Sequence, residues 1–310
     1  MTRDPIGSPA IVIVLLSGGT GGAKLARGLL DASDELVVVA NTGDDVEVHG
    51  VHVSPDPDLV TYWLADAIHE RGWGLRDDTS AVMDALAAAG RPTWFHLGDR
   101  DLAMCLLRTE SLRAGRRLTE AHGAVVEAMG VAARVLPMSD QPVRTYVRRD
   151  GRSIPFQEFM IVQRTASAID GVELRGVESA RPSPDVLAAL AAAEAIVIGP
   201  SNPVISIGPI LALPGMRAAL AGAPAPVVAV SPFVDGSAVK GPTELFCASA
   251  GIERSASGVA RAYADVVDGM VADEPVDGLP CLVTDTLMDT SSKRRQVARK
   301  IVEFGCSLSQ

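Results

Sequence analysis

Five unbroken apolar runs, rich in β-branched residues, constrain the fold of this chain more than any other feature. Such runs are typical of strands in a parallel sheet that is covered on both faces. They lie at 11–16 (IVIVLL), 36–41 (LVVVAN), 93–98 (TWFHLG), 195–202 (AIVIGPSN) and 226–232 (PVVAVSP). Ala- and Leu-rich stretches with helical spacing lie between and around them, at 23–32, 61–70, 79–90, 118–130 and 185–195. The alternation predicts a doubly wound α/β fold with a mainly parallel sheet.

One segment interrupts this alternation. Residues 138–182 contain two extended pieces that flank Asp150-Gly151, a pair that favours a tight hairpin turn. We therefore predict a single domain over residues 1–310, with a small inserted hairpin and helical subdomain at 138–182. Residues 291–304 predict an amphipathic C-terminal helix. Ligands of such sheets bind at the carboxyl ends of the strands, so the loops after each strand are the candidate site.

Composition excludes several classes of protein. The formal net charge of −10 argues against a general nucleic-acid or anionic-membrane binder, because phosphate backbones select basic surfaces. The four cysteines form no C-x-x-C pair, which argues against zinc and favours reduced thiols in a cytoplasmic protein. The opening residues do not resemble a signal peptide, and the first apolar run is too short to span a bilayer.

The first candidate site is the glycine cluster that follows the first run, SGGTGG at 17–22. Glycines allow backbone N–H groups to approach an anion, and the following helix adds its positive end. Lys24 stands where a dinucleotide fingerprint requires glycine and does not fit the Walker spacing. Asn41 stands where NAD binding favours an acidic residue, so NAD is disfavoured. A tight strand-to-helix turn without a ligand remains the alternative.

Two acidic stretches follow the second run, NTGDD at 41–45 and SPDPD at 54–58. Carboxylates from two loops suit a hard divalent cation, usually magnesium where phosphates share the site. The alternative is structural, because Asp and Asn are also favoured in turns and at helix N-caps. Asp58, for example, precedes a helical stretch that it would cap.

Three further loops carry polar groups. His96 ends the predicted strand at 93–98 and precedes a charged turn that opens a helix, although a lone histidine is more often structural. The rigid loop at 199–216 offers Ser201, Asn202 and Ser206 as neutral hydrogen-bonding groups. The loop at 231–242 offers Lys240 to offset phosphate charge.

Together these motifs resemble the 2-phospho-L-lactate transferase family of deazaflavin coenzyme F-420 biosynthesis. The matching segments run in order over nearly the whole chain and are specific as a set. Pro57 departs from the family, in which we associate leucine with the corresponding place, and the residue at His96 varies among members. The segments are SGGTGGAKLARGL (17–29), NTGDD (41–45), SPDPD (54–58), RGWGLRDDT (71–79), LGDRDLA (97–103), LPMSDQPV (136–143), GPSNPVISIGPIL (199–211) and SPFVDGSAVKGP (231–242).

The resemblance implies a Rossmann-like fold, a homodimer and dependence on Mg²⁺. It implies an enzyme that transfers a phospho-organic acid from a guanosine diphospho donor to the ribityl hydroxyl of Fo, 7,8-didemethyl-8-hydroxy-5-deazariboflavin. GMP is the second product. Phospholactyl, phosphoenolpyruvyl and phosphoglyceryl groups all remain open as the transferred acid.

Site roles follow from the resemblance as hypotheses. Asp45 and Asp58 are the candidate catalytic residues, assigned to Mg²⁺ or to the attacking hydroxyl, and Asp44 is an alternative metal ligand. Asp58 and His96 match positions that approach Fo. The remaining candidates hold phosphate or the donor: Gly19, Thr20, Gly21, Gly22, Ser201, Asn202 and Lys240.

Two other functions are alternatives to the transferase. A related bacterial group shares the glycine loop and an NTGDD-like stretch but binds UDP-sugars as a non-catalytic metabolic regulator. LGDRDLA and GPSNPVISIGPI favour the transferases. A nicotinamide-dependent dehydrogenase is disfavoured by Lys24 and Asn41.

Overall fold

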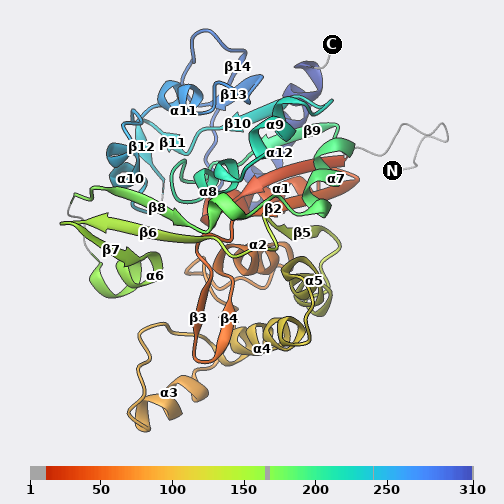
Figure 1. The fold of residues 1–310 in the computed structure, drawn as a ribbon. Coiled ribbons are helices and arrows are strands. Elements are labelled where there is room, and N and C mark those ends of the chain that lie inside the picture. Colours follow the sequence, from red (N-terminus) through yellow and green to blue (C-terminus); the bar gives the residue numbers. More distant parts are fainter. Residues whose placement is uncertain (1–11, 165–167, 240, 309–310) are drawn as a thin grey trace, which may run out of the picture.

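A seven-stranded parallel sheet forms the centre of the protein (Figure 1). The computed structural model describes residues 12–164, 168–239 and 241–308. The sheet order is β14-β13-β10-β9-β1-β2-β5, and every neighbouring pair is parallel. Its α/β arrangement confirms the predicted Rossmann-like fold class. The strands are β1 (Val12–Ser17), β2 (Glu35–Ala40), β5 (Arg134–Pro137), β9 (Ala195–Ile198), β10 (Val227–Val230), β13 (Gly269–Ala272) and β14 (Cys281–Val283).

The order of the strands reverses between β1 and β9. From β1 the chain builds outward through β2 to β5, and it then returns to the other side of β1 and builds outward through β9, β10, β13 and β14. Leu16 of β1 pairs with Ile198 of β9, and Ser17 pairs with Ala40 of β2. The loops that leave these strands therefore start side by side. A reversal of this kind is where open α/β sheets bind their ligands.

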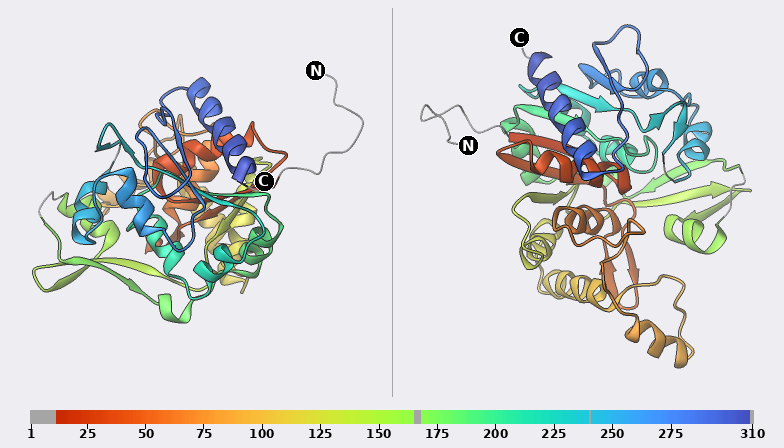
Figure 2. Two further views of the ribbon diagram at one scale, coloured as in Figure 1. Left: turned by 90° about the horizontal axis from the view of Figure 1, so that it is seen from above. Right: turned by 180° about the vertical axis from the view of Figure 1, so that it is seen from behind.

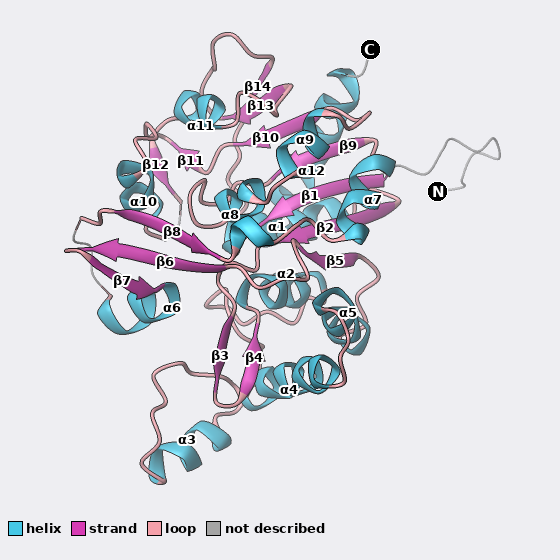
Figure 3. Cartoon of the chain, viewed as in Figure 1, coloured by secondary structure: helices cyan, strands magenta, loops and turns pink. Residues whose placement is uncertain are grey.

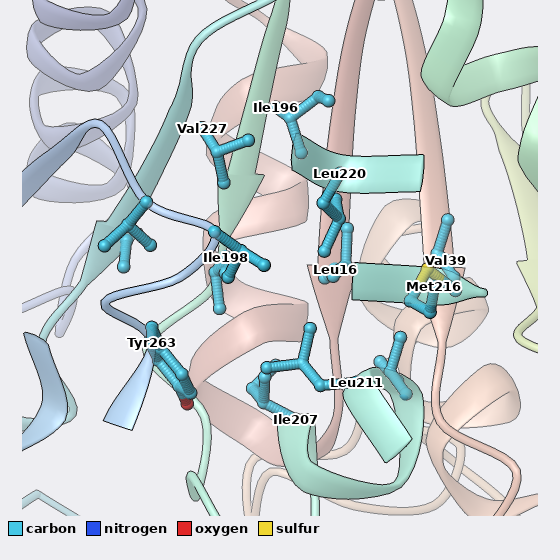
Figure 4. Packing of buried hydrophobic residues seen from close by; sticks show 14 of the residues in the cluster. Leu16, Val39, Ile196, Ile198, Ile207, Leu211, Met216, Leu220, Val227 and Tyr263 are labelled. Atoms are coloured by element: carbon cyan, nitrogen blue, oxygen red, sulfur yellow. The ribbon is translucent and has the colours of Figure 1, made fainter. Parts of the chain in front are cut away.

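Helices cover both faces of the sheet, because each strand is apolar on both faces. Ile13 and Leu15 of β1 pack against one helical layer, and Val14 and Leu16 pack against the other. Figure 4 shows the second layer, with Ile207 among the helical side chains that reach the sheet. The first layer contains α1 (Gly19–Leu30), α2 (Pro55–Leu64), α5 (Leu118–Ala128) and α12 (Ser291–Leu308). The second contains α7 (Pro184–Ala192), α8 (Ile207–Ala212), α9 (Met216–Ala221) and α11 (Ala256–Ala262).

The C-terminal helix packs beside the N-terminal one. Figure 2 shows α12 lying along α1, and a Cβ at Gly28 would lie 2.5 Å from the carbonyl oxygen of Arg294. Within the described ranges, no helix combines the length and the apolar character that a membrane span requires.

The segment that interrupts the alternation forms a second, antiparallel sheet. Its order is β7-β6-β8, and the turn between β6 and β7 is made by Asp150 (φ 51°) and Gly151 (φ 69°), as the Asp-Gly pair predicts. A short helix and a π-helical turn follow β7 and pack on α10 (Thr243–Ser249) through Phe156, Phe159 and Phe246. The elements are β6 (Arg144–Arg149), β7 (Arg152–Pro155), α6 (Phe156–Glu158), the π-helix Phe159–Gln163 and β8 (Gly171–Arg175).

Two segments that flank α2 in the sequence, residues 46–53 and 81–113, extend away from the sheet (Figures 1 and 3). They form the hairpin β3 (Val46–Val48) and β4 (Val51–Val53), and then α3 (Ala81–Ala88) and α4 (Asp99–Arg113). Residues 93–98 were predicted as a strand, and that prediction is wrong. Phe95 and Leu97 are buried against Val51 and Val53 of the hairpin instead of entering the sheet. The remaining elements are the short helix Val177–Ser179, β11 (Phe233–Val234) and β12 (Ser237–Ala238).

The close approach of α1 to the loop after β9 makes a testable prediction. A Cβ at Gly21 would lie 2.1 Å from the carbonyl oxygen of Pro200, which is backbone and cannot move alone. We expect Gly21→Ala to lower the free energy of unfolding by about 1–3 kcal/mol, as overpacking does. The matched control is Gly123→Ala on the exposed surface of α5, where the Cβ meets no described atom within 4 Å.

Thermal and urea unfolding measure both variants. Gly123→Ala should be neutral or gain up to about 1 kcal/mol, because alanine favours helix. Equal stabilities for the two variants would show that α1 does not press on the loop as described.

Candidate active site

The glycine cluster and the loop 199–206 meet at the reversal between β1 and β9. A Cβ at Gly22 would lie 2.2 Å from Ser17 Oγ and 2.8 Å from Ser201 Oγ. The backbone N–H of Gly18 donates to Ser201 Oγ at 3.4 Å. Glycine at these positions thus follows from contact between two loops. Gly19 and Thr20 form the half-buried start of α1.

The helix α2 presents two carboxylates in different directions. Asp56 and Asp58 lie two residues apart in its first turn, which separates their side chains by roughly 200° around the axis. Asp56 accepts from the N–H of Gly19 at 2.7 Å and from Asn41 Nδ2 at 2.9 Å, so it lies on the glycine loop. Asp58 accepts both of its side-chain hydrogen bonds from Arg108 of α4.

Asp44 is a second buried carboxylate near Asp56. It is 8% exposed, and its Oδ1 has no hydrogen-bond partner among the described residues. Burial raises the pKa of Asp44 well above its ordinary value, and the negative charge of Asp56 raises it further. Burial also raises the pKa of Asp56 to about 6, against the hydrogen bonds from Asn41 and Gly19 that lower it. Two neighbouring buried carboxylates with an open oxygen fit a divalent cation.

Other buried polar atoms around these acids also lack partners within the described part of the chain. Asn202 holds its loop by accepting at Oδ1 from the N–H groups of Val204 (2.8 Å) and Ile205 (3.2 Å), which leaves Nδ2 as an unused donor. Native interiors satisfy nearly all such groups, so this concentration marks a ligand site. The unpartnered atoms at this edge are Ser17 Oγ, Thr42 Oγ1, Asp44 Oδ1, Thr145 Oγ1 and Asn202 Nδ2.

Asp45 is held in a different network. Its Oδ1 accepts from Ser54 Oγ at 2.7 Å, and its Oδ2 lies 2.9 Å from His52 Nε2. His52 Nδ1 lies 2.6 Å from Glu47 Oε1, across the β3–β4 hairpin. Hydrogen bonds to the carboxylates raise the pKa of His52, although burial opposes them. Asp45 therefore fastens the hairpin to the start of α2, and its predicted catalytic and metal roles stay predictions.

Asp58 lies on the α4 side of α2. Burial raises its pKa to about 7, and the charge of Arg108 opposes that rise. Asp58, Asp101 and Cys105 offer ligand atoms within 4.8 Å of one another, the one such group of three found among the described residues. The guanidinium of Arg108 already supplies positive charge to this cluster, which argues against a cation there.

The remaining candidates lie apart from this edge. His96 is exposed on the loop before α4, 3.0 Å from Ser80 Oγ, rather than at the end of a strand. Tyr62 donates to Asp101 Oδ1 at 2.7 Å and so ties the start of α4 to α2. Lys240 lies outside the described residues.

Sequence reasoning named Asp44, Ser201, Asn202 and the glycine loop as candidates but did not name Asp56. The signal was available, since helical periodicity from Pro55 turns Asp56 and Asp58 in different directions. Arg108 gave no such signal, because nothing in the sequence marks that arginine as buried.

The raised pKa values of Asp44 and Asp56 lead to a prediction about how the stability of the fold depends on pH. Because burial raises their pKa values, the folded protein without metal retains protons that the unfolded chain has lost. The stability contribution of each group is full below about pH 4. That of Asp56 is lost as the pH rises through about 6, and that of Asp44, whose pKa burial also raises, is lost as the pH rises. Asp44→Asn removes one of the charges with little change of shape. We expect it to flatten this fall and to raise the melting temperature at neutral pH.

Thermal unfolding with and without Mg²⁺ gives the second readout. Mg²⁺ should raise the melting temperature of the wild type at neutral pH by binding the folded state, and it should do so much less for Asp44→Asn. Asp277→Asn, an exposed change, is the control and should behave as wild type. An undiminished response in Asp44→Asn would exclude Asp44 as a ligand.

Comparison with solved structures supports the fold. A member of the UPF0052 family from Bacillus halodurans superposes with a TM-score of 0.60 and 18% sequence identity, over 96% of this chain and 100% of that one. At this identity the match shows a shared fold.

Sequence comparison shows the family. The family model for 2-phospho-L-lactate transferase CofD matches residues 13–299. A phosphoenolpyruvate transferase from Kitasatospora aureofaciens is 40% identical over 306 aligned positions, and the match covers 93% of this chain and 95% of the relative. A 2-phospho-L-lactate transferase from Methanosarcina mazei is 40% identical over 303 aligned positions, and the match covers 94% of this chain and 99% of the relative. These matches confirm the resemblance seen in the motifs: the chain belongs to the 2-phospho-L-lactate transferase (CofD) family.

Proposed function

We propose that this enzyme transfers a phospho-organic acid from a guanosine diphospho donor to the terminal ribityl hydroxyl of Fo and releases GMP, a step of coenzyme F-420 biosynthesis. The observation that carries the proposal is the set of unpartnered buried polar atoms beside two acids, at the reversal between β1 and β9. Membership of a transferase family, with relatives named for phospholactate and phosphoenolpyruvate, supplies the chemistry.

The donor is proposed to lie across the carboxyl ends of β1 and β9. Residues 19–22 open α1, whose N–H groups and dipole favour a phosphate. Ser201 and Asn202 offer neutral hydrogen-bonding groups on the facing loop, and the Nδ2 atom of Asn202 is free to donate. Such groups suit a nucleotide diphosphate, since they add little charge of their own. We keep Lys240 as a proposed counter-charge.

Magnesium is proposed to sit at Asp44 and Asp56. Burial raises the pKa values of both acids, and the charge of Asp56 raises that of Asp44 further; a divalent cation would offset the cost of these buried charges, and the Oδ1 atom of Asp44 is open. When bound, Mg²⁺ neutralises charge on the diphosphate and on the departing GMP. Asp56 also receives the Gly19 N–H, so it fixes the cation relative to the glycine loop. Asp45 and Asp58, the first candidates from the sequence, engage other side chains here, so they are kept as alternative ligands.

Transfer is proposed to proceed by direct displacement. The ribityl oxygen forms a bond to the distal phosphorus of the donor, the bond from that phosphorus to the bridging oxygen breaks, and GMP leaves with the electron pair. Alignment and charge stabilisation account for most of the catalysis in such reactions. Asp58 and His96 are kept as proposed contacts of the acceptor because of the family resemblance. The proton of the acceptor hydroxyl passes to water. The predicted homodimer stays a proposal.

Product analysis tests the function. Purified protein with Mg²⁺ and Fo is offered guanylylated phospholactate, phosphoenolpyruvate or phosphoglycerate in turn, and mass spectrometry identifies the diester and GMP. We expect one donor to be preferred by about tenfold or more, because these acids differ by small groups that a pocket can distinguish. Absence of GMP release with every donor would reject the proposal.

Thermal-shift measurements distinguish the transferase from the alternative, a non-catalytic UDP-sugar-binding regulator. Fo and GDP are expected to stabilise the fold, and UDP-N-acetylglucosamine is not. The reverse result would favour the non-catalytic UDP-sugar regulator.

A further inference from the structure

Arg108 is a charged side chain placed in the interior. It is 0% exposed, and it donates from Nη1 to Asp58 Oδ2 at 2.9 Å and from Nη2 to Asp58 Oδ1. Within the described residues, Arg108 is the side chain that hydrogen-bonds the Asp58 carboxylate, and it engages both oxygens. A buried guanidinium is costly unless a carboxylate compensates it, so each member of the pair holds the other in place.

His122 lies next to Asp58 but does not donate a hydrogen bond to its carboxylate. Thr61 Oγ1 gives its hydrogen to the carbonyl oxygen of Pro57 at 2.8 Å, so it must accept from His122 Nε2 at 3.2 Å. The hydrogen is therefore on Nε2, and burial lowers the pKa of His122, which keeps the ring neutral. Its Nδ1 then presents a lone pair to Asp58 Oδ1 at 3.9 Å. Two acceptors do not attract, so Arg108 rather than His122 is the side chain that orients Asp58.

The first turn of α2 links this pair to the glycine loop. The backbone N–H of Asp58 donates to Ser54 O at 3.0 Å, so Asp58 closes the first helical turn. Asp56, two residues earlier in the same turn, holds Gly19 and Asn41 from the opposite side. A rotation of this turn that releases Asp58 would carry Asp56 away from the loop, because both acids share one rigid backbone.

We propose that Arg108 is a positioning residue for the transfer reaction, because its two-point hold on Asp58 fixes the rotation of α2 and thereby keeps Asp56 on the glycine loop. Arg108 is 0% exposed, so we do not propose that it contacts either substrate. This inference rests on the proposed function, and it assigns a task to a residue of α4 that lies outside the matching motifs.

Arg108→Lys tests the role. Lysine keeps the positive charge but offers a point donor that cannot hold both carboxylate oxygens. At saturating substrates we expect kcat to fall by about tenfold or more, since small misplacements of a site are costly, while the KM for Fo changes little. The Mg²⁺ concentration for half-maximal activity and the Mg²⁺-induced rise in melting temperature should both shift toward weaker binding.

Arg113→Lys is the matched control. Arg113 ends the same helix and donates to the carbonyl oxygen of Gly50 at 2.9 Å, away from Asp58. It should match the wild type in kcat and in Mg²⁺ response. Loss of melting temperature in Arg108→Lys with unchanged kcat and unchanged Mg²⁺ response would reduce Arg108 to a structural residue and overturn the proposal.

A second comparison covers the case in which Arg108→Lys does not fold. Asp58→Asn is compared with the uncharged pair Asp58→Asn with Arg108→Gln. If Arg108 acts through Asp58, the second change adds no further loss of kcat, whereas losses that multiply overturn the proposal. If the wild type transfers the group to Fo and the Arg108 variants are equally active, the positioning role of Arg108 is rejected and the proposed function stands. A wild type inactive with every donor rejects the proposed function and this role with it.

Discussion

One buried amide connects the loops on which the site depends. Asn41 is 0% exposed at the end of β2, and its Oδ1 accepts from the N–H of Gly43 at 2.8 Å. Its Nδ2 donates to Asp56 Oδ2 at 2.9 Å and to the carbonyl oxygen of Ile205 at 3.2 Å. The residue that argues against NAD in the sequence thus joins its own loop, the start of α2 and the loop after β9. An aspartate at this position would lose both donations and would add a third buried charge.

Two acids of one motif, Asp56 and Asp58, face two different environments. Both are buried, but Asp56 is met by neutral amide donors and Asp58 by a full guanidinium charge. A neutral donor stabilises a buried carboxylate less than a cation does, so Asp56 keeps unsatisfied negative charge at the sheet edge. Arg108 therefore compensates the charge of Asp58 on the interior side of α2, whereas the hydrogen bonds that Asp56 accepts from Gly19 and Asn41 bring no positive charge.

The sequence predicted what depends on local pattern. Unbroken apolar runs identified β1, β2, β9 and β10, because a strand that is buried on both faces is apolar at every position. Helical spacing of apolar residues identified α1, α5, α7 and α12. The short strands β5, β13 and β14 were missed, and residues 93–98 were misassigned, because three to six apolar residues do not say which surface they pack on. The partners of Asp45 and Asp58 come from distant or unremarkable positions, so spacing alone does not reveal them.

Asp56, which is hydrogen-bonded to the glycine loop, opposes the binding of a phosphate there unless its negative charge is compensated. The start of α1 attracts anions, yet its Gly19 N–H is already bonded to the carboxylate of Asp56. A phosphate that approaches meets that negative charge and the charge of Asp44 in a region of low dielectric, where repulsion is strong. With a divalent cation between them, the same acids become part of an attractive site. On the proposed function, the loop is therefore built for a phosphate and its metal together, which is why it matches no motif that binds phosphate through glycines and lysine alone.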